Sequence, residues 1–180
     1  MDNGFGPLPD SRIVITVFAR TAESGLDAAG AFGGGMLEPL AGLVEAHRRM
    51  ATVQPDWDDV ELTWTPGQKG PVLSTAGGNA EPFASAWEDA QRHMLAIDLE
   101  ACKVLGQPDA GAVEHHEGLG AVLGRMAHLY TISFNRFVLD GPEGRNRQQL
   151  GRALVSYDSL ARDLVCGKKC LPSPLTRPDW

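Results

Sequence analysis

The sequence lacks the features that define several common classes of small protein. Its 180 residues include three cysteines, an odd number that does not suit a disulfide framework. No uninterrupted apolar run reaches the roughly 18 residues of a membrane-spanning helix. The opening MDNGFGPLPDSR has neither the basic nor the apolar part of a secretion signal. We therefore expect a cytoplasmic protein that does not associate with a membrane.

Basic residues are scarce in the first half of the chain. Residues 1–90 hold 5 Lys and Arg against 13 Asp and Glu, whereas residues 91–180 hold 11 against 10, and the net charge is −7. This balance disfavours general polyanion binding. With 43% hydrophobic residues, the chain is long enough for one domain over residues 1–180. We expect residues 1–11 to be a loose lead-in and residues 171–180 a tail.

Recognisable catalytic and cofactor motifs are also missing. Gly25 and Gly35 bracket a glycine-rich connection that lacks both the Gly-Lys-Ser/Thr of a phosphate loop and the GxGxxG of a dinucleotide site. No serine lies in a G-x-S-x-G sequence, and no Glu is followed by His three residues later, as in di-iron bundles. The sequence predicts no cofactor and no metal site, and it favours a protein that is not an enzyme.

Strand-like patterns lie in the first half of the chain. The β-branched and aromatic run at residues 12–20 predicts a strand that is buried on both faces. Residues 60–65 and 71–75 flank a Pro- and Gly-containing connection and predict a β-hairpin. Between these patterns, apolar residues recur at helical spacing over residues 36–50.

Helical patterns fill the second half. Apolar residues from Phe83 to Val104 recur at steps of three and four, and Trp87 belongs to this expected core stripe. Residues 112–139 predict a central buried helix. Asp140 and Glu143 resemble a capping box that starts a last helix ending near Gly167. The short corners between these helices favour antiparallel neighbours.

Together these elements predict an α+β fold. Its small sheet comprises one N-terminal strand plus a β-hairpin, and it packs on a predominantly helical C-terminal three-helix antiparallel bundle. The alternative is an all-α bundle with a decorating hairpin.

A polar stripe marks the first half of the predicted helix 112–139. Glu114, Glu117, Arg125 and His128 fall at roughly helical steps. We favour a solvated face, since Glu in a first turn stabilises the helix dipole. In the alternative, this polar face and the glycine-rich connection form the site of a small enzyme or ligand-binding domain.

Three tryptophans outside the core stripe, Trp57, Trp64 and Trp180, indicate a protein interface, because tryptophan is enriched at binding hot spots. The alternative for Trp57 and Trp64 is packing at the edge of the core.

The C-terminal region offers two further candidate sites. Cys166 and Cys170 enclose two lysines, which favour the thiolate. We favour a structural or incidental role for this pair, and the alternative is a redox pair whose reversible disulfide closes the tail. For the basic side chains of the C-terminal region we favour a solvated outer helix face, and the alternative is contact with phosphates. These basic side chains are Arg145, Arg147, Arg152, Lys168 and Lys169.

The leading hypothesis is a non-enzymatic protein that binds another macromolecule, in the first place another protein. It would act as an assembly factor, an inhibitor or a small subunit of a complex. Nucleic-acid binding through the basic C-terminal helix is a weaker alternative. The sequence does not indicate the oligomeric state.

Overall fold

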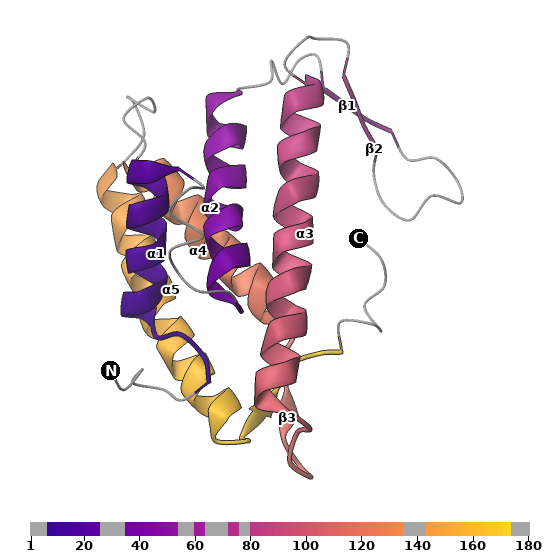
Figure 1. The fold of residues 1–180 in the computed structure, drawn as a ribbon, viewed down its shortest axis with the longest axis vertical. Helices are drawn as coiled ribbons and strands as arrows, with labels where there is room; N and C mark the ends of the chain where they lie inside the picture. Colours follow the sequence, from indigo (N-terminus) through magenta and orange to yellow (C-terminus); the bar gives the residue numbers. More distant parts are fainter. Residues whose placement is uncertain are drawn as a thin grey trace.

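The computed structural model describes residues 7–25, 35–53, 60–63, 72–75, 80–134 and 143–173. Most of these residues are helical, and Figure 1 shows α2 and α3 side by side, with α1 and α5 together on the other side of α2. The five helices are α1 Ser11–Ser24, α2 Leu37–Thr52, α3 Ala80–Leu105, α4 Leu119–Phe134 and α5 Glu143–Val165.

Helix α1 corrects the predicted N-terminal strand, because it covers all of residues 12–20. The Asp10 side chain accepts a hydrogen bond from the Ile13 N–H at 2.8 Å and caps the helix. Gly25, with φ 71°, ends it. β-branched residues only weakly disfavour a helix, and one side of this helix is buried at the spacing i, i+3, i+4, i+7. The buried residues are Val14, Val17, Phe18 and Thr21.

The sheet is reduced to two short pairs. β1 Val60–Thr63 pairs antiparallel with β2 Val72–Thr75, while their connection lies outside the described residues. β3 Val113–Glu114 pairs in parallel with β4 Lys169–Cys170. The predicted strand at residues 12–20 is a helix and joins neither pair, so the fold is helix-rich rather than built on a three-stranded sheet.

Helices α2 and α4 form the centre of the molecule. Helix α2 contacts α1, α3 and α4, and α4 contacts α2, α3 and α5. The predicted central helix over 112–139 is too long at its start, since α4 begins at Leu119 and residues 113–114 are a strand. Both helices supply fully buried side chains. These are Leu40, Leu43 and Val44 from α2, and Leu119, Leu123 and Met126 from α4.

Helices α3 and α4 meet at a glycine. A Cβ on Gly120 would lie 2.1 Å from the Met94 carbonyl oxygen, so only glycine allows the two backbones to approach this closely. The Gly120 N–H donates to the buried Asp98 carboxylate at 2.8 Å. Asp98 therefore provides from α3 the negative charge that stabilises the N-terminus of α4.

Helix α5 is attached to the start of the chain by hydrogen bonds. The Tyr157 hydroxyl is buried and donates to the Pro9 carbonyl at 2.6 Å, and burial raises the pKa of Tyr157. The Asp158 carboxylate accepts from the Ser11 N–H at 2.9 Å and from its hydroxyl at 2.7 Å. Leu8 is buried as well, so the described part of the predicted loose lead-in is packed.

Replacing Tyr157 with Phe is expected to lower the free energy of unfolding by about 1–3 kcal/mol, because the buried Pro9 carbonyl loses its donor. Urea unfolding followed by circular dichroism measures this loss. Ser159→Ala, at an exposed position of the same helix, is the control and should change stability by less than about 0.5 kcal/mol. Equal effects of the two substitutions would contradict the assignment.

Candidate functional site

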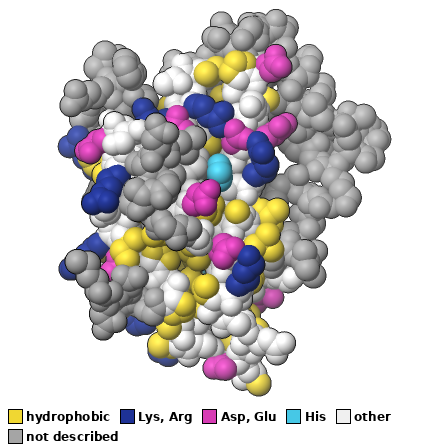
Figure 2. Space-filling model, in the orientation of Figure 1, with side chains coloured by type: hydrophobic (Ala, Val, Ile, Leu, Met, Phe, Trp, Pro, Cys, Tyr) yellow, Lys and Arg dark blue, Asp and Glu magenta, His cyan; other side chains and the backbone are white. Residues whose placement is uncertain are grey.

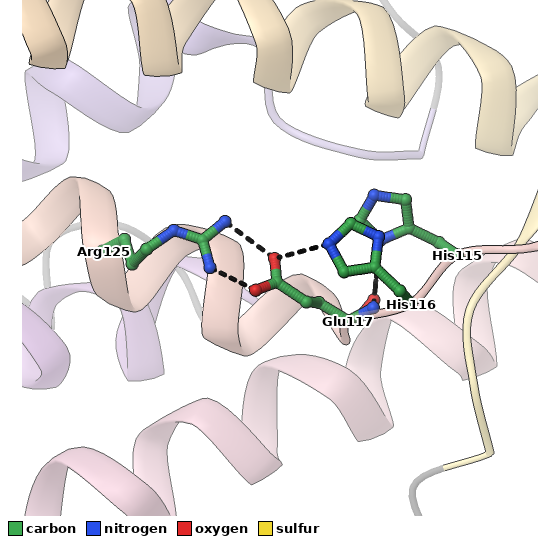
Figure 3. Close-up of polar contacts among 4 residues, drawn as sticks. All are labelled: His115, His116, Glu117 and Arg125. Atoms are coloured by element: carbon green, nitrogen blue, oxygen red, sulfur yellow. Dashed lines mark hydrogen bonds and ion pairs between the residues drawn. The ribbon is translucent and has the colours of Figure 1, made fainter.

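The start of α4 carries an ion pair between Glu117 and Arg125. Arg125 binds both carboxylate oxygens, with Nη2 2.7 Å from Oε2, and this hydrogen bonding lowers the pKa of Glu117 (Figure 3). His116 Nε2 lies 3.8 Å from Oε2. His115 Nδ1 lies 2.9 Å from the backbone carbonyl oxygen of Glu117. The pair connects the segment before α4 to the helix itself.

The predicted polar stripe is only partly on one helix. Glu114 belongs to β3 and Glu117 precedes α4, whereas Arg125 and His128 lie within α4. The structure thus brings Glu117 and Arg125 together, and it places Glu114 on a strand instead of the predicted helical face. The Glu117 carboxylate and the Arg125 guanidinium are instead paired with each other.

His128 contacts a histidine that the predicted site did not include. Its ring lies 5.6 Å, centroid to centroid, from the ring of His47 on α2. The His47 Nε2 is buried without a hydrogen-bond partner. Burial, followed by the nearby His128, lowers the pKa of His47 to about 4, and burial also lowers the pKa of His128. In the sequence, the helical spacing of His47 with Leu40, Leu43 and Val44 was the signal that His47 lies on the buried face of its helix.

The two candidate redox cysteines lie at the C-terminal end of the described residues. Cys166 and Cys170 are free thiols, Cys166 exposed after the end of α5 and Cys170 half-buried in β4. The proposed disulfide is therefore not formed in this structure. Within the described ranges, no three or more His, Cys, Asp or Glu side chains lie together as a group that could hold a metal ion.

The predicted basic residues lie on or just after α5. Arg145, Arg147 and Arg152 are exposed, as is Lys168, whereas Lys169 is half-buried with its Nζ 3.7 Å from an Asp163 carboxylate oxygen. The Arg147 guanidinium lies 5.3 Å from the centroid of the Phe134 ring. Helical geometry at about 100° per residue places Arg145 and Arg152 only about 20° apart around α5.

Helix α3 presents apolar side chains to solvent. Trp87, Leu95, Leu99 and Val104 are half of the eight exposed large apolar residues in the described part of the chain. Figure 2 shows apolar surface beside charged side chains along α3. Trp87 is 47% exposed, which corrects its predicted place in the core. Of that stripe, α3 buries Ala90, Ile97 and Ala101, and it also buries Ala86, so its buried residues are mostly small.

We call the side of α3 opposite these buried residues the outer α3 face. At its centre, Leu95 is 50% and Leu99 39% exposed. The sequence pattern did not reveal this face, because the apolar repeat through Ala90 and Ile97 defines the buried side of α3. Leu95 and Leu99 belong to a second series at the same helical spacing, on the opposite side. The face comprises Ser85, Glu88, Arg92, Leu95, Leu99, Cys102 and Lys103.

The predicted tryptophan interface cannot be placed, because Trp57, Trp64 and Trp180 lie outside the described residues. The same holds for residues 26–34 of the glycine-rich connection. Among the helices that the structure describes, none has the length and apolar character needed to cross a membrane. Comparison of the chain with protein-family models, curated proteins and solved structures found no match.

Proposed function

We propose that this chain is a non-enzymatic protein that acts by binding another protein through the outer α3 face. The observation that carries the proposal is the exposure of Leu95 and Leu99, one turn apart, on a helix whose opposite side is core. Burying a leucine side chain contributes about 1.5–3 kcal/mol. Contiguous exposed apolar side chains rimmed by polar ones are typical of interaction sites.

The charges around the leucines fit a binding face. Glu88 and Arg92 precede the leucines and Lys103 follows them, and all three side chains are exposed. Charged residues at the rim of an apolar patch provide orientation and partner choice more than affinity. The enzyme alternative draws less support, because the Glu117 carboxylate is held by Arg125.

The double substitution Leu95→Glu and Leu99→Glu is expected to abolish partner binding, because it puts two carboxylates in the centre of the face. Immobilised wild-type protein and the variant are incubated with lysate of the source cells, and captured proteins are quantified by mass spectrometry. The variant should capture at least tenfold less of the specific partners, as expected when about 1.4 kcal/mol or more of binding energy is removed.

Val155→Glu is the matched control, since Val155 is an exposed apolar residue on α5. It should capture the same proteins as the wild type, and circular dichroism should show that both variants keep their helices. Equal capture by wild type and the double variant would contradict the proposal, as would a wild type that captures nothing specific.

Nucleic-acid binding through α5 is the second candidate function. The exposed charged side chains described on α5 are all arginines, whereas its acids Asp158 and Asp163 are half-buried and engaged with Ser11 and Lys169. The net charge of −7 opposes this function, so binding would have to depend on the positive charge of the α5 arginines and not on the charge of the whole chain.

The dependence of nucleic-acid affinity on salt concentration tests whether the arginines of α5 bind phosphates. If Arg145 and Arg152 both contact phosphates, raising salt from 50 to 200 mM should weaken DNA or RNA binding by roughly tenfold. Arg145→Glu with Arg152→Glu should remove most of that dependence. Fluorescence anisotropy with labelled single- and double-stranded oligonucleotides measures both effects. No binding to either probe at 50 mM salt would rule this function out.

A further inference from the structure

The exposed positions along α3 follow a repeat of their own. Ser85, Glu88, Arg92, Leu95 and Leu99 are exposed and are separated by three, four, three and four residues, and Cys102 continues the series three residues later. An alternation of three and four averages 3.5 residues, the spacing of the seam between two helices of a coiled coil. The outer α3 face is therefore patterned to receive another helix.

We propose that the helix received is α3 of a second copy of this chain, lying antiparallel. This inference rests on the proposed function and names its partner. An antiparallel pair can bury both leucines of both copies in one register, with Leu95 of each copy opposite Leu99 of the other. Arg92 then lies opposite Cys102 of the second copy, and the two-fold axis passes near Ala96 and Ile97.

Charge selects the antiparallel orientation over the parallel one. In a parallel pair, equivalent seam residues face each other, so Glu88 would meet Glu88 and Arg92 would meet Arg92. Like charges across such a seam are unfavourable. In the antiparallel register, Lys103 lies within about one helical turn of Glu88 and Asp89 of the second copy. This opposite-charge contact occurs twice, once at each end of the seam.

Ion pairs within one chain already restrain charged side chains of the outer α3 face. Asp89 binds Arg92 and also Arg49 of α2, and Lys103 binds Glu100. These contacts restrain the charged side chains of the face, while Leu95 and Leu99 remain exposed. Pre-ordered side chains lose less entropy on association. A stable interface buries about 800 Å² on each partner, and this seam contributes two exposed leucines per copy, so we expect a weak, concentration-dependent dimer.

Sedimentation equilibrium of the full chain over about 5 to 500 µM tests the association. The weight-average mass of the wild type should rise with concentration from one chain towards two. Leu95→Glu with Leu99→Glu should remain at one chain throughout, and Val155→Glu should behave as the wild type. A wild type that stays at one chain over the whole range would overturn the second copy as partner. If the double variant then still lost proteins captured from lysate, the proposed function would stand without this inference.

Cysteine cross-linking tests the orientation. In a background with the three native cysteines replaced by serine, Leu95→Cys protein mixed with Leu99→Cys protein should form a disulfide-linked pair on mild oxidation. Each variant alone should form several-fold less. A parallel pair gives the opposite result, because Leu95→Cys would link to itself, and this outcome would overturn the proposed orientation.

Discussion

Replacing Gly120 with alanine is expected to lower the free energy of unfolding by about 3 kcal/mol. The added Cβ would lie 2.1 Å from the carbonyl oxygen and 2.6 Å from the carbonyl carbon of Met94. Backbone atoms cannot rotate away as a side chain can, so α3 and α4 must separate. Overpacking of this kind costs about 1–3 kcal/mol, occasionally more, and separation also weakens the hydrogen bond from the Gly120 N–H to Asp98.

Two other glycines provide matched controls for Gly120. A Cβ on Gly124 would lie 2.8 Å from the Met94 sulfur, and this flexible side chain can move, so Gly124→Ala should cost less than Gly120→Ala. A Cβ on Gly151 would have no neighbour within 4 Å, so Gly151→Ala should stabilise α5 by about 0.5–1 kcal/mol. Urea unfolding of the three variants gives the order. A Gly120→Ala protein as stable as Gly151→Ala would contradict the close crossing of α3 and α4.

Stability is expected to fall by ~3 kcal/mol as the pH falls from about 6.5 to about 4, because of His47. The pKa of this side chain is lowered from 6.5 to about 4 by burial and by His128. The unfolded chain therefore takes up the proton first as the pH falls, and the neutral buried ring stabilises the fold fully only above pH 6.5. One pKa unit corresponds to about 1.4 kcal/mol, and the loss is spread between the two pKa values.

A His47 variant separates this effect from other titrations. His47→Leu should flatten the dependence of unfolding free energy on pH between 4 and 6.5, whereas Ser159→Ala, at an exposed position without an ionisable side chain, should leave it unchanged. Glu117 contributes in a lower window, since its pKa is lowered below 4.5 by Arg125. Urea midpoints at pH 4.5, 5.5 and 7 measure the slope. An unchanged slope in His47→Leu would show that His47 is not the responsible group.

The helix positions that the sequence predicted well have a clear apolar period. Helix α2 follows the pattern at residues 36–50, and α3 follows the pattern through Ala90 and Ile97. Helix α1 was predicted as a strand because the half-buried Ile13 and Ile15 flank the buried Val14 in the sequence. They turn the helical spacing of the buried residues into a continuous apolar run. An unbroken apolar run does not distinguish a strand from a buried helix. Helix α4 begins later than predicted because residues 113–114 form β3 instead of helix. β3 pairs with β4, which is far away in the chain, so the local sequence does not show this pairing.

The candidate sites depend on contacts that the sequence pattern does not show. Glu117 and Arg125 were predicted to share one helical face, whereas Glu117 precedes α4 and meets Arg125 as an ion pair. The contact between His47 and His128 joins two helices far apart in sequence, so spacing alone could not reveal it. Trp87 was assigned to the core by its apolar spacing. The alanines beside it instead pack α3 closely against its neighbours, and the larger Trp87 side chain lies at the surface.

Site-specific photo-cross-linking tests the central claim, that the outer α3 face binds protein, most directly. A photoreactive phenylalanine analogue replaces Leu99 in one protein and Val155 in another, and each is irradiated in the source cells. We expect covalent adducts at position 99 that contain a second copy of the chain, and none at position 155. Adducts of the same composition at both positions, or no adduct at position 99, would contradict it.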